Sequence, residues 1–124
     1  MQIDYDDDIQ QARHIISGGP FLVKNGHKFL NTKQEKFQNI SGKNPRTAVG
    51  LRGNSEIVFV TVSGRENGNV GLSLNELADF MLSIGCTDAL NLDGGSSSVM
   101  YINGQVVNKN VTNSTPVSNI IAVY

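Results

Sequence analysis

The sequence predicts an α+β domain: a mixed or mostly antiparallel sheet, one helix at about residues 73–85, and two Asn-Gly hairpins. Three observations support this fold class. Short β-prone runs recur between turn signals, one segment carries a helix N-terminal signature, and the 124 residues include 13 glycines without a repeat. A chain of this length is expected to fold as a single domain over residues 1–124, with a core that buries about two-thirds of the unfolded surface.

The N-terminal stretch up to Arg13 is rich in aspartate and leaves two interpretations open. It is either a short helix with an acidic first turn or an irregular acidic start. The run His14–Ser17 that follows is β-prone and ends at Gly18-Gly19-Pro20, a strong turn signal.

A hairpin is predicted from Phe21–Lys24 and Lys28–Leu30. Between them lies Asn25-Gly26, a dipeptide that tolerates positive φ at both centres of a two-residue turn. The polar, lysine-rich stretch Thr32–Asn44 is expected to be a surface loop.

Two strands are predicted in the middle of the chain. Arg46–Arg52 is a short strand with a charged residue at each end, and Glu56–Val62 is almost continuously apolar. Because such a run is typical of a strand covered on both faces, we expect Glu56–Val62 to lie at the centre of the sheet. Ser63-Gly64-Arg65 ends this strand.

The helix is the element with the clearest local signals. Ser73 and Glu76 form a capping box, and Gly85 stands where a C-terminal glycine belongs. The apolar residues recur at helical spacing and predict one buried face. They are Leu74, Leu77, Ala78, Met81 and Leu82.

After the helix the sequence predicts a strand at Ala89–Leu92 and a second hairpin. Its arms are Val99–Ile102 and Gln105–Val107, and its turn is Asn103-Gly104. A polar loop follows, and Ile120–Tyr124 is expected to be a closing strand.

Charge and composition exclude several classes of protein. Ten basic and eleven acidic side chains give a net charge of -1, so nucleic acid is not expected as a partner. No apolar run reaches the ~20 residues of a membrane span, and the acidic Met1–Asp8 does not resemble a signal peptide. Cys86 is the single cysteine and is expected in the core. A reducing, cytoplasmic location is therefore predicted.

The stretch from Asn91 to Ser98 is the first candidate for chemistry. A carboxylate at a strand end, followed by glycines and hydroxyls, can form an anion-binding loop with an acid beside it. The alternative, a glycine-rich turn in which Asp93 caps its own backbone, stays open.

Two arginines at strand ends are the second candidate. Arg46, next to Thr47, and Arg65 each offer a guanidinium fork to a phosphate or carboxylate. For each arginine an ion pair with a surface acid is the alternative, such as Glu66 for Arg65. His14 and His27 have no companion at metal-ligand spacing. No cofactor is predicted, and a divalent metal ion is left open.

Taken together, the motifs resemble the phosphodiester glycosidase family over about residues 8–124. The segments that carry the resemblance are Gly18–Gly26, Arg46–Gly50, Ser63-Gly64-Arg65, Gly71–Leu74, Ala89–Ser97 and Pro116–Asn119. The resemblance implies hydrolysis of a sugar–phosphate diester at the sugar. It implies Asp93 and Glu66 as catalytic candidates. As residues that bind the substrate or its phosphate it implies Gly18, Gly19, Arg46, Thr47, Arg65, Gly94, Gly95, Ser96, Ser97 and Asn119.

The chain departs from the family pattern in three places. The family's Asp-Gly-Arg is Ser63-Gly64-Arg65 here, Ser96 replaces a loop glycine, and the upstream half of the domain is not in the sequence. The alternative function is a non-catalytic binding protein that sequesters a nucleotide or cyclic-nucleotide signal, as a viral anti-defence protein would. A homo-oligomer is expected because a shortened domain would leave sheet edge and apolar surface uncovered.

Overall fold

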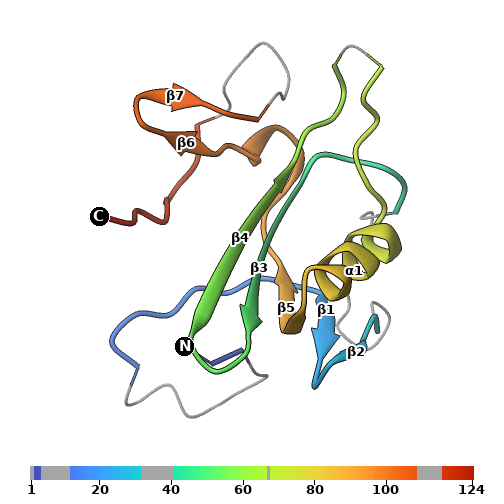
Figure 1. Ribbon diagram of the computed structural model, residues 1–124. Coiled ribbons are helices and arrows are strands. Elements are labelled where there is room, and N and C mark those ends of the chain that lie inside the picture. The colour runs from blue at the N-terminus through green and yellow to red at the C-terminus, as the bar shows by residue number, and fades with distance from the viewer. Residues whose placement is uncertain (1, 4–11, 32–40, 67, 109–115) are drawn as a thin grey trace.

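The computed structural model describes residues 2–3, 12–31, 41–66, 68–108 and 116–124. In this part of the chain a five-stranded sheet has the order β2-β1-β5-β3-β4, all neighbours are antiparallel, and helix α1 covers one face (Figure 1). The α+β prediction with a mostly antiparallel sheet is confirmed. The elements are β1 (Phe21–Lys24), β2 (His27–Lys28), β3 (Arg46–Arg52), β4 (Glu56–Val62), α1 (Leu74–Ser83), β5 (Cys86–Asn91), the 3-10 turn η1 (Gly95–Ser97), β6 (Tyr101–Ile102) and β7 (Gln105–Val106).

Helix α1 begins and ends where its local signals predict. The Ser73 hydroxyl accepts from the Glu76 N–H at 3.2 Å, and the Glu76 carboxylate accepts from the Ser73 N–H at 2.9 Å. At the other end Gly85 has φ +85° and donates its N–H to the Leu82 carbonyl at 2.9 Å. These contacts satisfy backbone groups that a helix end leaves without intrahelical partners.

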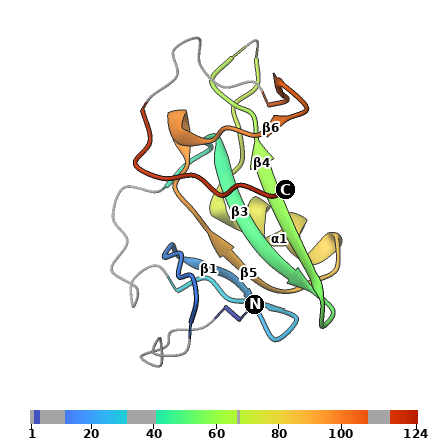
Figure 2. The ribbon, with the colours of Figure 1, turned by 90° about the vertical axis from the view of Figure 1, so that its left-hand side faces the viewer.

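Both Asn-Gly turns form as predicted. Asn25 and Gly26 have φ values of +51° and +76° in the β1–β2 hairpin. Asn103 and Gly104 have φ values of +49° and +86° in the β6–β7 hairpin. The second hairpin is a separate two-stranded sheet, which lies away from α1 (Figures 1 and 2).

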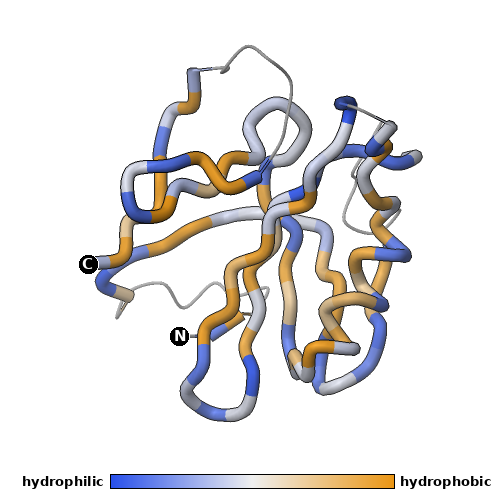
Figure 3. The backbone as a smooth tube through the Cα atoms, turned by 45° about the horizontal axis from the view of Figure 1, so that its top comes forward, coloured by the Kyte–Doolittle hydropathy of each residue, from blue (hydrophilic) through white to orange (hydrophobic). Residues whose placement is uncertain are grey.

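The core lies between α1 and the sheet, where apolar residues of the helix and strands gather (Figure 3). Its largest fully buried apolar side chains include Leu22, Leu77 and Met81. The helix approaches β3 closely at Gly50, where a Cβ would lie 2.7 Å from Cys86 Sγ and 2.8 Å from Met81 Cε. Cys86 is 3% exposed, as expected, and burial raises the pKa of its thiol.

The prediction that Glu56–Val62 is the central strand is wrong. β4 pairs only with β3 within the described sheet and forms its edge. Its alternate residues Val58 and Val60 pack partly buried against the core, while Ile57 on the other face is 48% exposed. The continuous apolar run of β4 therefore indicates that its residues favour the β conformation, and it does not indicate that both faces of the strand are buried.

Other differences concern the ends of the chain. Ile120–Tyr124 forms no strand and is exposed, and His14–Ser17 is likewise exposed and without strand structure. Within the described residues, neither run pairs with another strand, and β propensity alone does not supply a hydrogen-bonded neighbour.

β5 begins at Cys86, earlier than expected. The expected acidic helix and most of the Thr32–Asn44 loop lie outside the described residues.

Candidate functional site

A pocket of about 570 Å³ lies at the end of the sheet where β5 ends and β3 begins. The antiparallel register places Ala48 opposite Asn91, so the start of β3 and the segment after β5 meet there. A third segment joins them because the Gly19 N–H donates to the Asn91 carbonyl at 2.7 Å. The described lining residues are Ser17, Gly18, Gly19, Asn44, Arg46, Arg65, Asn91, Leu92, Asp93, Gly94 and Gly95.

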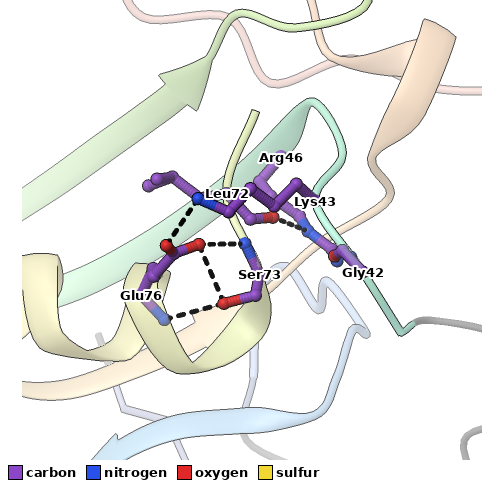
Figure 4. Close-up of polar contacts among 6 residues, drawn as sticks. All are labelled: Gly42, Lys43, Arg46, Leu72, Ser73 and Glu76. Carbon is purple, nitrogen blue, oxygen red and sulfur yellow. Dashed lines mark hydrogen bonds and ion pairs between the residues drawn. The ribbon is translucent and has the colours of Figure 1, made fainter. Parts of the chain in front are cut away.

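Arg46 is a buried cation in the pocket wall, with 4% of its surface exposed. Its Nε donates to the Leu72 carbonyl at 3.0 Å and its Nη2 donates to the Gly42 carbonyl at 2.9 Å (Figure 4). Burial, and then the charge of Arg65, lower the Arg46 pKa from its ordinary value. An anion in the pocket would offset both causes.

The N-terminus of α1 is tied to the segment that precedes Arg46 (Figure 4). Lys43 Nζ lies 2.8 Å from Glu76 Oε1. The Lys43 hydrogen bond and the bonds to Ser73 hold the Glu76 pKa at about 2. Leu72, next to the helix cap, accepts from both Arg46 and the Asn44 N–H. The capping motif of the helix therefore also places the arginine.

Arg65 reaches the pocket from an unusual backbone conformation, with φ +61°. Its Nη2 donates to Asn44 Oδ1 at 2.6 Å. A Cβ on Gly95 would lie 3.7 Å from its guanidinium nitrogens. In the described part of the chain Arg65 forms no ion pair, so the alternative of an ion pair with Glu66 is not realised. Its charge is available to a ligand.

Asp93 is the carboxylate among the described lining residues. It is exposed and makes no hydrogen bond or ion pair with another described residue, so the capping alternative is not realised either. The Gly95 N–H donates to the Pro45 carbonyl at 2.8 Å, and the Ser97 N–H donates to the Gly94 carbonyl at 3.1 Å. Because these two amides donate to backbone carbonyls of the protein, they stabilise the loop conformation. The two arginines are therefore the main groups of the pocket that can bind an anion.

The opposite wall is the Gly18-Gly19 segment. A Cβ on Gly18 would lie 2.6 Å from the Asn91 carbonyl oxygen, so a larger residue does not fit. Asn91 is 6% exposed, and its Nδ2 donates to the Gly19 carbonyl at 2.9 Å. Its Oδ1 is buried without a hydrogen-bond partner among the described residues.

The structure brings seven of the predicted site residues together in the pocket lining: Gly18, Gly19, Arg46, Arg65, Asp93, Gly94 and Gly95. Five others are not among the described lining residues: Thr47, Glu66, Ser96, Ser97 and Asn119. Asn119 belongs to the exposed C-terminal segment, and Glu66 forms a backbone bridge with Asn69.

Sequence reasoning gave no role in the site to Asn44 or to Asn91, although Asn91 begins the candidate stretch. Asn91 lies two residues before Asp93 at the end of a strand, and that spacing could have indicated it, since alternate residues share a face. Asn44 carries no such signal, because its contact with Arg65 spans 21 residues.

No group of three or more metal-ligating side chains occurs within residues 12–31, 41–66, 68–108 and 116–124. No helix of the described chain is long and apolar enough to cross a membrane.

The profile of the phosphodiester glycosidase family matches residues 2–124. The SPbeta prophage-derived protein YomE of Bacillus subtilis is 33% identical over 97 residues, covering 78% of this chain and 15% of YomE. The bovine N-acetylglucosamine-1-phosphodiester alpha-N-acetylglucosaminidase is 33% identical over 101 residues, 73% of this chain and 19% of that protein. The chain thus spans less than a fifth of the length of these curated relatives.

A solved structure agrees with the sequence relatives. The catalytic domain of the zebrafish N-acetylglucosamine-1-phosphodiester alpha-N-acetylglucosaminidase, auto-inhibited by its pro-peptide, superposes with a TM-score of 0.68 at 25% identity. The match covers 83% of this chain and 37% of that one. The chain belongs to the phosphodiester glycosidase family.

Proposed function

We propose that the pocket binds a sugar–phosphate diester and that the chain hydrolyses its bond at the sugar. The observation that carries this proposal is the meeting of Arg46, Arg65 and Asp93 around one cavity of about 570 Å³. The names of the bovine and zebrafish relatives, which act on a sugar phosphodiester, support the same reaction class.

The charges of the pocket suit this reaction. Cleavage of the bond between the anomeric carbon and the phosphate oxygen builds positive character on the sugar and negative charge on the leaving phosphate. Arg46 and Arg65 stabilise the phosphate, and water completes the hydrolysis at the anomeric carbon. Asp93 lies in the same pocket to stabilise the sugar or to transfer a proton. A phosphate needs less protonation to leave than an alcohol does, so the two arginines contribute to catalysis beside Asp93.

The test is release of free sugar from a panel of sugar–phosphate diesters and sugar nucleotides. Asp93→Asn should lower kcat by about 10²–10⁴-fold, the contribution of a positioned acid or base. Arg65→Ala should lower kcat/KM by about 10- to 100-fold, as loss of a hydrogen bond to a charged group does.

The matched control is Arg52→Ala. Arg52 is exposed at the far end of β3 and contacts Glu56, so its loss removes one positive charge away from the pocket. Activity that falls equally in the Arg52 and Arg65 variants would contradict the assignment of the pocket. A wild-type chain that releases no sugar from any diester, but returns intact nucleotide after heat denaturation, would overturn hydrolysis in favour of sequestration.

A further inference from the structure

Residues 42–44, which precede β3, contact both arginines of the pocket. Arg46 Nη2 donates to the Gly42 carbonyl at 2.9 Å. Arg65 Nη2 donates to Asn44 Oδ1 at 2.6 Å. Burial, and then the charge of Arg65, lower the Arg46 pKa, and the second cause means that the two guanidinium groups repel each other. Because of this repulsion, their spacing depends on the oxygen atoms that hold them.

The two ends of this segment are anchored differently. Asn44 exchanges two backbone hydrogen bonds with Leu72, at 3.1 and 3.0 Å. Gly42 has φ +80°, and no described atom lies within 4 Å of its Cβ position. Glycine loses more conformational freedom than other residues do when its backbone is fixed. The Gly42 carbonyl therefore depends on a further contact to stay in place beside Arg46.

Lys43, between these two residues, supplies that contact (Figure 4). Its Nζ lies 2.8 Å from Glu76 Oε1. The other carboxylate oxygen, Glu76 Oε2, accepts from the Ser73 N–H and from the Ser73 hydroxyl, each at 2.9 Å. These bonds hold the carboxylate on the first turn of α1, whose buried face packs in the core. The ion pair therefore joins residues 42–44 to a helix that the core anchors.

We propose that Lys43 and Glu76 are positioning residues for both arginines. Their ion pair holds residues 42–44 so that the Gly42 carbonyl and Asn44 Oδ1 keep the two guanidinium groups at the spacing that a phosphate requires. Neither Lys43 nor Glu76 is among the described lining residues, so both act through the arginines and not on the substrate. The consequence for phosphate binding rests on the proposed function, whereas the effect on the arginines does not.

Glu76→Gln separates positioning from charge. A glutamine keeps the capping box but carries no charge to pair with Lys43. Loss of a negative charge near the arginines would by itself strengthen the binding of inorganic phosphate, whereas loss of positioning weakens it. In phosphate titrations followed by calorimetry, we expect Glu76→Gln to bind about 3- to 10-fold more weakly than wild type, a smaller loss than removal of a whole arginine contact would give.

Three further variants complete the test. Lys43→Met breaks the same ion pair and should give a similar loss, and the double variant should bind no more weakly than the weaker single variant, because the pair is already broken. Lys43→Arg keeps the pair and should bind phosphate as wild type does. Lys28→Met is the matched control: Lys28 of β2 pairs with Asp79 of the same helix at 2.5 Å, but it is not among the described lining residues. It should leave the phosphate affinity unchanged.

Exchange of the Arg46 guanidinium protons with water, followed by NMR, measures the positioning without phosphate. It should be at least about threefold faster in Lys43→Met and Glu76→Gln than in wild type, and unchanged in Lys28→Met. Unchanged exchange in Glu76→Gln would overturn the proposal, and so would phosphate binding as strong as that of a wild type that binds it, or an equal effect in Lys28→Met. A wild-type chain that binds no phosphate would overturn the proposed function instead, and the exchange rates would still decide whether the ion pair positions Arg46.

Discussion

The contact between Gly71 and Asn44 supports both arginines of the pocket, and Gly71→Ala tests it. Gly71 has φ +83°, and a Cβ there would lie 2.1 Å from the Asn44 carbonyl oxygen and 2.2 Å from its carbon. Because the obstacle is backbone, no side-chain rotation relieves the clash. The two segments of this isolated bridge must separate, which stretches the Asn44 N–H bond to the Leu72 carbonyl at 3.1 Å and the reverse bond at 3.0 Å.

The expected cost combines two terms. A non-glycine residue in the left-handed region costs about 1 kcal/mol, and each weakened backbone bond costs about 0.5–1.5 kcal/mol. Gly71→Ala should therefore lower the free energy of unfolding by about 2–4 kcal/mol. Gly68→Ala is the matched control: Gly68 has φ +81°, but no described atom lies within 4 Å of its Cβ position. It should cost only the first term, about 1 kcal/mol.

Urea unfolding of the two variants measures the difference directly. Inorganic phosphate titrations should also separate them, because the Leu72 carbonyl holds Arg46 and Asn44 holds Arg65. We expect weaker phosphate binding in Gly71→Ala and wild-type binding in Gly68→Ala. Equal stabilities of the two variants would refute the steric reasoning, and unchanged phosphate affinity in Gly71→Ala would refute the link to the arginines.

Two further predictions concern the helix cap and the pocket wall. The Lys43 and Ser73 hydrogen bonds lower the Glu76 pKa from 4.5 to about 2, so the ionised carboxylate stabilises the fold above pH 4.5 and this contribution is lost as the pH falls toward 2. In urea unfolding, the stabilities of wild type and Glu76→Gln should differ most above pH 4.5 and converge near pH 2. Lys43→Met should weaken the same pH dependence. A difference in stability that stays constant across this range would contradict the assignment to the ionised Glu76 carboxylate. Asn91→Ala removes the bond to the Gly19 carbonyl and should cost about 1–3 kcal/mol in the same assay. Asn91→Asp should cost more, because a carboxylate oxygen would then face that carbonyl; an aspartate variant as stable as wild type would show that the bond is unimportant.

Elements whose signals lie within a few residues could be predicted. The capping box of Ser73 and Glu76 and the φ tolerance of Asn25-Gly26 act over at most four residues, so no distant contact is needed to produce them. Part of the candidate site could be predicted because its residues follow or precede predicted strands. Arg46, Arg65 and Asp93 each adjoin a strand end, where loop residues gather, but their meeting around one pocket depends on the register of β3 and β5.

The amino-acid sequence by itself determined the helix, the two Asn-Gly turns, the fold class and the motifs of the family, because each depends on local backbone preferences or on residue order. Only the tertiary structure decided that β4 is an edge strand, that Ile120–Tyr124 does not join the sheet, and that Asn44 and Asn91 line the pocket. The physical reason is that a strand's place in a sheet is set by which neighbours complete its hydrogen bonds. The pattern of apolar residues indicates only that the side chains favour a β-strand, and it does not indicate which strands lie beside it.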